Sequence, residues 1–331
     1  MSNLLKKMNK ISVTNIKVTN LTPKINDPEL IKLLPTVNIP DHMEFVLSGV
    51  DNSVSNAIRR TIACELLVSG LNITVDDIET NDEFIISEFI TSRIKLIPIK
   101  QSCPLDAVFE LYVENNTPVV MDVKTGQITI VNKGSPHPLK SIPFNETFTL
   151  LSIQPGKSIR IKNIRVMQNY CKKDTFGGYA VASNVTSVAQ DQIPINMYEP
   201  DSKGIPSSVS NPQVWKISYN TNGTIPAKDI VPATCDNIIE RSKNVKELLY
   251  SVIQNEKEYL LTVQGETHTM GNLLMRAVLA LYPDIPSVVY KADDNNDSMT
   301  LRIASHDDAV EIIENAIDHI IKIFTRIRTY F

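Results

Sequence analysis

Asp293, Asn295 and Asp297 stand at the alternate spacing that opens a calcium-binding loop. Such a loop also needs a glycine at its sixth position and a bidentate glutamate at its twelfth, because the chain must turn sharply around the ion. Ser298 and Ala304 occupy those two positions. The coordination is therefore incomplete, and we expect no calcium site here.

The other reactive side chains are scattered rather than clustered. No cysteine has another within metal-ligand spacing, so we expect no zinc, and we interpret the thiols as free and kept in a reducing compartment. His268 lies at the start of an expected helix, and we interpret it as a local hydrogen-bonding residue rather than a general base. Neither paired carboxylates nor a Ser/His/Asp set is evident, and the sequence predicts no catalytic residue and no cofactor. The residues concerned are Cys64, Cys103, Cys171, Cys235, His42, His137, His268, His306 and His319.

One motif occurs twice, and the rest of the chain is arranged around the two copies. Each copy is an apolar run rich in strand formers, then a glycine, a hydroxyl residue and an amphipathic helix pattern. The copies align without a gap: Gly49 falls on Gly265, Ser53 on Thr269, Asn56 on Asn272 and Arg60 on Arg276. We expect a strand, a turn and a helix twice over, with Ser53 and Thr269 as the N-caps.

Each expected helix has one apolar face. Val54, Ile58, Ile62 and Leu66 recur at helical spacing in the first copy. Met270, Leu274, Val278 and Leu281 do so in the second copy, and a final helix over residues 307–328 carries a third stripe. Faces of this kind must be buried against another element. We expect the two units to bury them on one another as a pseudo-twofold pair, through residues that include Ile58, Ile62, Leu274, Val278, Ile313, Ile320 and Phe324.

Composition limits the classes of protein to consider. The chain has 331 residues, of which 42% are hydrophobic and 21% charged, with a formal net charge of −4. The length predicts about two domains, and the negative charge argues against a protein that grips nucleic acid by itself. No apolar run approaches the roughly 20 residues of a membrane span. We expect a soluble intracellular protein of the α+β class.

The pattern divides the chain into four parts. Residues 1–40 form an N-terminal arm, with an edge strand at 11–18 and a short helix at 28–34. Residues 41–99 and 210–254 form the first unit, which includes a helix at 83–92, a strand at 93–99 and a long helix at 227–254. Short β-type runs separated by turn residues predict an inserted, mainly β domain at 100–209. Residues 255–331 form the second unit.

Two stretches carry a family resemblance. Residues 45–61, followed by Ser87-Glu88-Phe89-Ile90-Thr91-Ser92-Arg93-Ile94-Lys95-Leu96-Ile97-Pro98-Ile99, resemble the third-largest subunit of eukaryotic RNA polymerase II, its archaeal D counterpart and the bacterial alpha N-terminal domain. Residues 266–274 resemble the eleventh subunit of polymerase II and its archaeal L counterpart. A fusion of the two is similar to polymerase subunits of large cytoplasmic DNA viruses, which implies the host cytoplasm and the virion as locations.

The resemblance implies a non-catalytic platform that joins the largest and second-largest polymerase subunits, together with a small subunit resembling the tenth subunit of polymerase II. It implies that Arg59 and Arg60 contact the second-largest subunit, with Arg93 and Lys95 as weaker interface candidates, because a guanidinium suits a carboxylate or carbonyl cluster. Nucleic acid would be met only through the complex, and no membrane is involved. Only Cys103 and Cys171 lie in the inserted domain, so the metal site of some family members is not expected.

Two alternatives stay open at this point. One is a stand-alone enzyme or ligand-binding α+β protein with an internal duplication, which predicts a pocket with convergent polar residues. The other is a direct nucleic-acid binder, which predicts salt-dependent binding of DNA by the pure chain.

Overall fold

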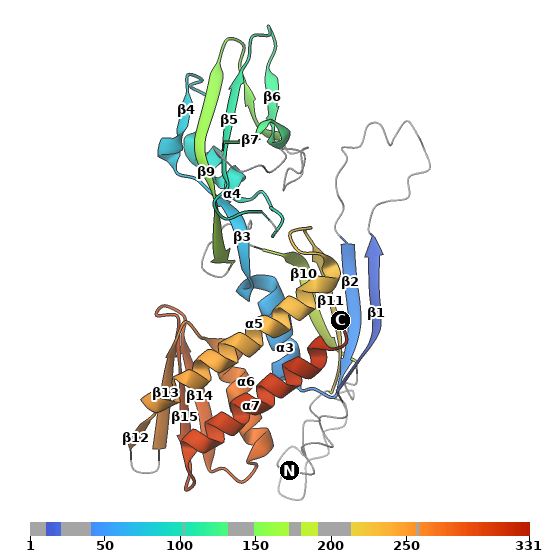
Figure 1. Cartoon of the computed structure of the whole chain (residues 1–331), viewed down its shortest axis with the longest axis vertical. Helices are drawn as coiled ribbons and strands as arrows, with labels where there is room; N and C mark the ends of the chain where they lie inside the picture. Colours follow the sequence, from blue (N-terminus) through green and yellow to red (C-terminus); the bar gives the residue numbers. More distant parts are fainter. Residues whose placement is uncertain are drawn as a thin grey trace, which may run out of the picture.

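The computed structural model describes residues 11–20, 41–101, 103–131, 149–171, 180–190, 213–255 and 258–331. Helices and sheets are mixed, and the buried side chains form two separate hydrophobic cores. The larger core holds both copies of the sequence motif and the long helices, and the smaller core lies in the upper part of Figure 1. The expected helix at 28–34 falls outside the described residues. Within them, no helix is long and apolar enough to span a membrane.

The first sheet has the strand order β1-β2-β11-β10 and is antiparallel throughout. Its alternating sequence explains its burial, because Phe45 and Leu47 on β2 and Trp215 and Ile217 on β11 all face the core. β1 is an edge strand, as expected. The strands are β1 (Ser12–Asn20), β2 (Asp41–Ser48), β10 (Ala182–Ala189) and β11 (Val214–Thr221).

Helix α3 (Asn52–Arg60) follows β2 and continues into a π-helical turn, Thr61–Glu65. The expected N-cap, Ser53, is wrong by two residues. Asp51 caps the helix, since its carboxylate accepts from the backbone N–H groups of Ser53 and Val54 and from the Ser53 hydroxyl. A carboxylate is also favoured at the positive end of the helix dipole, which explains why Asp51 rather than Ser53 is the N-cap.

Helix α5 (Ala227–Glu247) is shorter than expected, and Pro232 lies inside its second turn. A short 3-10 turn (Leu249–Ser251) leads into β12 (Ile253–Asn255), where the sequence had predicted more helix. β12 pairs with the start of the following strand, Glu258–Leu260. The ladder hydrogen bonds of this hairpin replace those that two further helical turns would have made.

The second sheet has the order β12-β13-β15-β14, with β13 (Glu258–Gln264), β14 (Ser287–Asp293) and β15 (Ser298–Ala304). Helix α6 (His268–Leu281) follows β13, and helix α7 (Ala309–Arg328) follows β15. Thr267 stands at the N-cap of α6, so the expected cap at Thr269 is wrong. Asp308 caps α7 by accepting from the Val310 N–H.

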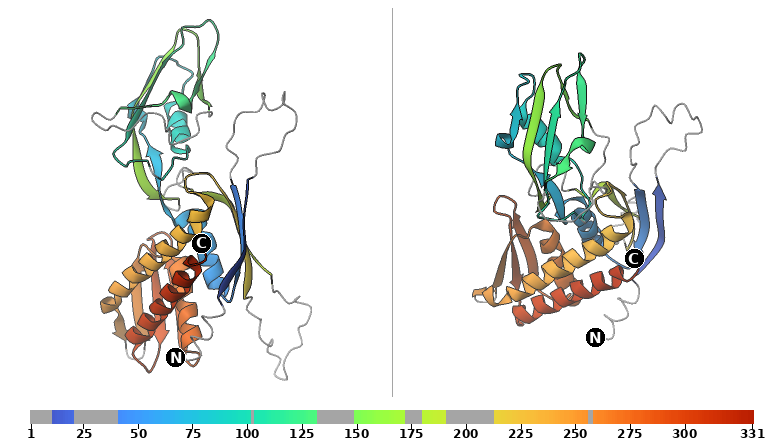
Figure 2. Two further views of the ribbon diagram at one scale, coloured as in Figure 1. Left: turned by 45° about the vertical axis from the view of Figure 1, so that its right-hand side comes forward. Right: turned by 45° about the horizontal axis from the view of Figure 1, so that its top comes forward.

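The four helices meet between the two sheets. α5 lies along α7, and α3 contacts α6. Figures 1 and 2 show α5 and α7 side by side, and in Figure 1 they cross in front of α3 and α6. Pairs across α5 and α7, namely Lys246 with Asp318 at 2.8 Å and Arg328 with Asp236 at 2.7 Å, show that these two helices run antiparallel.

The smaller core is built on a long strand, β9 (Ser158–Tyr170), which pairs with β3, β4 and β5. The expected strand at 93–99 is wrong, because residues 93–95 end helix α4; Ile90, Ile94 and Ile97 recur at helical spacing and are buried. The other elements are β3 (Leu67–Asn72), a 3-10 turn (Val75–Asp77), β4 (Ile78–Thr80), α4 (Ser87–Lys95), β5 (Val108–Glu114), β6 (Met121–Lys124), a 3-10 turn (Thr125–Gln127), β7 (Thr129–Ile130) and β8 (Thr149–Ile153).

The boundaries between the cores differ from the expected division of the chain. The smaller core begins at Leu71 and includes α4, although residues 71–99 were expected with the first unit. Conversely, β10 belongs to the first sheet although it lies within the range 100–209. Strand pairing explains both differences. β3 pairs with β9 and so leads the chain into the smaller core, whereas β10 pairs with β11 and so joins the first sheet.

Gly271 allows α6 to approach β14 closely. A Cβ atom at this position would collide with the ring of Tyr290, lying 2.9 Å from its Cγ. An alanine normally stabilises a helix by about 1 kcal/mol relative to glycine. We expect Gly271→Ala instead to lower the free energy of unfolding by about 1–3 kcal/mol, measured by urea denaturation, because the ring must move. In a Tyr290→Leu background the same alanine is expected to be harmless or stabilising; equal losses in both backgrounds would contradict the explanation.

Candidate functional site

The helices of the two motif copies contact one another and bury the apolar faces that the sequence predicted. Seven side chains were predicted to pair the two units, and all of them lie in the larger core with at most 1% of their surface exposed. They come from α3 and its π-helical extension, α6 and α7. These residues are Ile58, Ile62, Leu274, Val278, Ile313, Ile320 and Phe324.

A group of charged and polar side chains, most of them buried, lies at one end of this apolar contact. We name Arg60, Glu65, Arg241, Glu266 and Thr269 the polar cluster. Glu65 closes the π-helical turn after α3 and is 1% exposed. Its Oε1 accepts a hydrogen bond from the Thr269 hydroxyl at 2.6 Å, and its Oε2 lies 2.7 Å from Nη1 of Arg241. The first-copy helix is thereby tied to the start of the second-copy helix.

Arg241 of α5 is the centre of the polar cluster. Besides Glu65, its guanidinium binds both oxygens of Glu266, with Nε at 2.8 Å and Nη2 at 2.5 Å. Only 13% of the Arg241 side chain and 9% of the Glu266 side chain are exposed. Such a bidentate pair is strong and directional, because the planar guanidinium fork fits the carboxylate.

Electrostatics keep these groups charged despite their burial. Burial opposes ionisation of Glu65, but the charge of Arg241 and the hydroxyl of Thr269 outweigh it and hold the pKa of Glu65 below its ordinary value. Burial likewise disfavours the charge on Arg241, but the hydrogen bonds and charge of Glu266, with those of Glu65, outweigh it and raise the pKa of Arg241. Glu65 and Arg241 therefore stabilise each other in their charged forms.

The lowered pKa of Glu65 predicts how stability depends on pH. The contribution of its ionised form is fully present above the unfolded pKa, about 4.3, and is lost as the pH falls through the lower pKa of the folded chain. We therefore expect Glu65→Gln to be less stable than the wild type at pH 7, with a smaller further loss below about pH 5. Urea denaturation from pH 7 to pH 3 tests this, with Glu258→Gln, at a half-exposed carboxylate, as control. Parallel curves for wild type and Glu65→Gln would contradict the assignment.

The two arginines predicted to face a partner subunit are held differently. Arg60 donates from Nε to the Thr269 hydroxyl at 2.9 Å, and its Nη2 lies 3.5 Å from Glu65 Oε1. Arg60 therefore bridges the two motif copies inside the chain. Arg59 is half-buried and donates from Nε and Nη2 to the Asn56 side-chain oxygen. Asn56 thus orients Arg59.

The two weaker interface candidates lie on α4, away from α3. Arg93 is exposed, its guanidinium lies over the ring of Phe89, and its Nη1 donates to the Leu150 carbonyl oxygen at 2.6 Å. Lys95 is half-buried. The structure therefore does not gather the four predicted interface residues into one patch.

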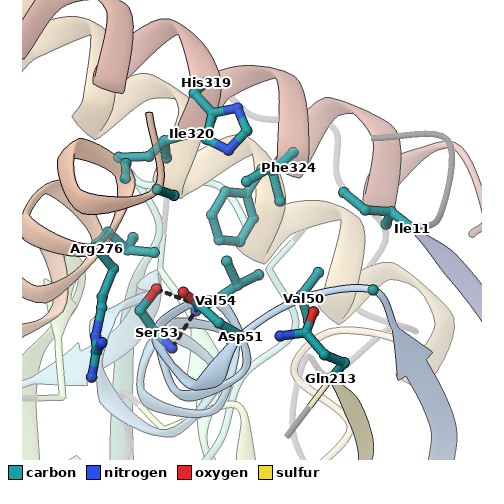
Figure 3. A pocket seen from close by; sticks show the side chains of 15 residues that line it. Ile11, Val50, Asp51, Ser53, Val54, Gln213, Arg276, His319, Ile320 and Phe324 are labelled. Atoms are coloured by element: carbon teal, nitrogen blue, oxygen red, sulfur yellow. Dashed lines mark hydrogen bonds between the residues drawn. The ribbon is translucent and has the colours of Figure 1, made fainter. Parts of the chain in front are cut away.

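The opposite end of the helix contact holds an apolar cavity of about 650 Å³ (Figure 3). Phe324 projects from α7 toward Val54 of α3, and the Asp51–Ser53 hydrogen bonds close the floor of the cavity. Arg276 and His319 are the basic side chains in the lining. In the described part of the chain, no three His, Cys, Asp or Glu side chains gather where they could hold a metal ion.

Sequence reasoning missed three members of the polar cluster: Glu65, Arg241 and Glu266. One signal was available for Glu65, which lies between Ile62 and Leu66 on an apolar helix stripe. Its partner Arg241 lies far away in the sequence, and no local pattern connects the two. Glu266 belongs to the second motif copy, so the sequence singled out its position but did not indicate its contact with Arg241.

Comparison with known proteins finds one matching domain and several similar chains. Residues 258–329 match the model of the RNA polymerase Rpb3/Rpb11 dimerisation domain. The chain is 26% identical to the DNA-directed RNA polymerase RPB3-11 homolog of African swine fever virus isolate Pig/Kenya/KEN-50/1950, over 95% of this chain and 93% of that protein. The homolog of strain Badajoz 1971 Vero-adapted is also 26% identical, over 89% and 88%. The polymerase protein Rpo3 of Thermococcus kodakarensis is 39% identical over 62 residues, 18% of this chain and 22% of Rpo3. The chain is therefore a homologue of the viral RPB3-11 proteins, with an Rpb3/Rpb11 dimerisation domain at residues 258–329.

Proposed function

We propose that this chain is a non-catalytic subunit of a multisubunit DNA-directed RNA polymerase and serves as its assembly platform. The observation that carries the proposal is the buried contact of α3 and α5, from the first half, with α6 and α7, from the second half. Helices α6 and α7 lie within the matched dimerisation domain. Relatives named as polymerase subunits that align over nearly the whole chain support it. Because the viral relatives are polymerase proteins, we place the chain in the host cytoplasm and the virion.

The platform consists of two similar α+β units related by a pseudo-twofold axis. The first unit combines the first sheet with α3 and α5, and the second combines the second sheet with α6 and α7. The inserted β domain is carried by the smaller core, which runs from about residue 71 to residue 166 among the described residues. Supporting this division, each unit contributes one strand–helix motif copy and one long helix to the shared core.

The largest and second-largest polymerase subunits are the proposed partners, with a small subunit resembling the tenth subunit of polymerase II. Arg59 is the proposed contact to the second-largest subunit, because Asn56 orients its guanidinium at a partly exposed position. Arg93 and Lys95 on α4 form a second, separate contact. Arg60 serves the pairing of the two units instead, since its bonds go to Thr269 and Glu65.

Co-expression with the two large subunits tests the proposal. Tagged wild-type chain is expected to recover both subunits. The Arg59→Glu variant is expected to recover at least about tenfold less of the second-largest subunit than the wild type does, because a charge reversal at a hot spot typically costs about 2 kcal/mol or more of binding free energy. Arg302→Glu, an exposed position on β15, is the matched control and should recover both. Equal recovery with Arg59→Glu would move the interface elsewhere. Failure of the wild type to recover either subunit, together with binding of a small ligand by the pure chain, would favour the stand-alone alternative.

A further inference from the structure

The two ends of the helix contact are built from aligned sequence positions but hold different chemistry. In the gapless alignment of the motif copies, Glu266 falls on Val50, Thr269 on Ser53, Glu65 on Leu281 and Arg60 on Arg276. The first members of these pairs make up most of the polar cluster. Val50, Ser53 and Arg276 line the apolar cavity at the other end. One end is therefore a closed ion-pair network, and the other is apolar and open.

The apolar part of the contact discriminates poorly between pairing with a second unit and pairing with another first unit. The stripes on α3 and α6 are similar, with Ile58 aligned to Leu274 and Ile62 to Val278. Hydrophobic burial is non-directional and roughly proportional to area. A first unit could therefore bury its stripe on the first unit of a second copy nearly as well as on its own second unit. Discrimination between these pairings needs a group that is satisfied in one of them and not in the other.

We propose that the polar cluster is the specificity element that makes a first unit pair with a second unit rather than with another copy of itself. The inference rests on the proposed function, because a platform with two different faces must be heterotypic. Only the heterotypic pairing brings Glu266 and Thr269 together with Arg241 and Glu65.

Each homotypic pairing loses these bonds. In a pair of second units, Glu266 would face Leu281 in place of Glu65, with no guanidinium from α5 nearby, and a buried carboxylate without a cation is strongly unfavourable. In a pair of first units, Arg241 would face Val50 and Ser53 and would lose the bidentate bonds that Glu266 supplies. The pair of second units is therefore penalised through Glu266, and the pair of first units through Arg241.

The experiment removes the asymmetry while keeping the core apolar. The full-length triple variant Glu65→Leu, Arg241→Met and Glu266→Val gives Glu65 and Glu266 the residues found at their aligned positions. Replacing a buried ion network by well-packed apolar side chains is often neutral or stabilising, so folding should persist. Two differently tagged copies of each variant are co-expressed, and capture of one copy by the other is measured. A carbodiimide cross-link between Lys246 and Asp318, which lie 2.8 Å apart across α5 and α7, reports heterotypic pairing.

We expect copy–copy capture to rise at least about tenfold over wild type in the triple variant, with a matching fall in the Lys246–Asp318 cross-link, because the penalty on homotypic pairing is gone. Glu266→Gln keeps the side-chain volume and should give a smaller shift in the same direction, so it decides the question if the triple variant aggregates. Wild-type levels of capture and cross-link in the folded variants would overturn the inference. That failure is separate from failure of the proposed function, which would appear as loss of the large subunits from the wild-type chain.

Discussion

Replacing Arg241 by methionine is expected to lower the free energy of unfolding by about 3–5 kcal/mol, because it leaves two buried carboxylates without their cation. Glu65 and Glu266 both lie against this guanidinium, and both are almost fully shielded from water. Methionine preserves most of the side-chain length, so the loss reports charge and hydrogen bonding rather than a large cavity. The measurement is urea denaturation followed by circular dichroism at pH 7.

The matched control for this prediction is Arg302→Met. Arg302 also faces a glutamate, Glu258 at 3.4 Å, but about half of each side chain is exposed. Exposed ion pairs contribute about 0–1 kcal/mol, so the control should be nearly as stable as the wild type. Similar small losses in both variants would show that the polar cluster contributes no more than a surface pair.

Truncating Phe324 to alanine is the second change with a large expected effect. Its ring is fully buried on α7 and projects toward α3 across the cavity, so it packs against both units. Removing a buried phenylalanine ring typically costs about 3–5 kcal/mol, and here the new space would join an existing cavity that the surrounding helices already fail to fill. We therefore expect a loss within that range, measured as a lower urea midpoint with an unchanged slope.

Phe84→Ala serves as the control for this second prediction. Phe84 is 83% exposed, just before α4, and its truncation should change the free energy of unfolding by no more than about 0.5 kcal/mol. If Phe324→Ala were equally mild, the ring would contribute little to pairing. A compensating rescue by Val54→Phe, from the opposite wall of the cavity, would locate the effect in the space between the two units.

The larger core could be predicted from the sequence because its signal is local and periodic. The stripes on α3, α6 and α7 recur at helical spacing, and a helix must bury such a face somewhere. The duplicated motif then identified the elements that carry the faces. In α7 the predicted residues Ile313, Ile320 and Phe324 are all buried.

Local choices between near-equal options were harder to predict. Asp51 and Ser53 are both good N-caps, and the structure uses the carboxylate with the hydroxyl as its donor. Residues 93–99 suit a strand by composition, yet Ile90, Ile94 and Ile97 also fit a helix, and packing of α4 against β3 settles the matter. Propensity is a weak guide wherever tertiary contacts override it.

The polar cluster lay beyond prediction for a different reason. Arg241 sits in an ordinary polar stretch of a long helix, and neither of its glutamates is close to it in sequence. Pairing of this kind depends on the three-dimensional crossing of α5 over the ends of α3 and α6. Arg60, predicted to face outward, is engaged inside the chain because α3 contacts α6 and brings Thr269 within its reach.

The order of elements along the chain determines when each part can fold during protein synthesis. The first sheet cannot be completed until β11 has been made, and α3 and α5 have no partner helices until residues 258–329 have followed. At about 5–20 residues per second, translation of that last segment takes about 4–14 s. During this interval the newly made apolar faces are accessible to chaperones and to neighbouring nascent chains. Because both halves leave the same ribosome, the length of the wait is fixed by elongation and does not depend on how much of a separately encoded partner the cell contains.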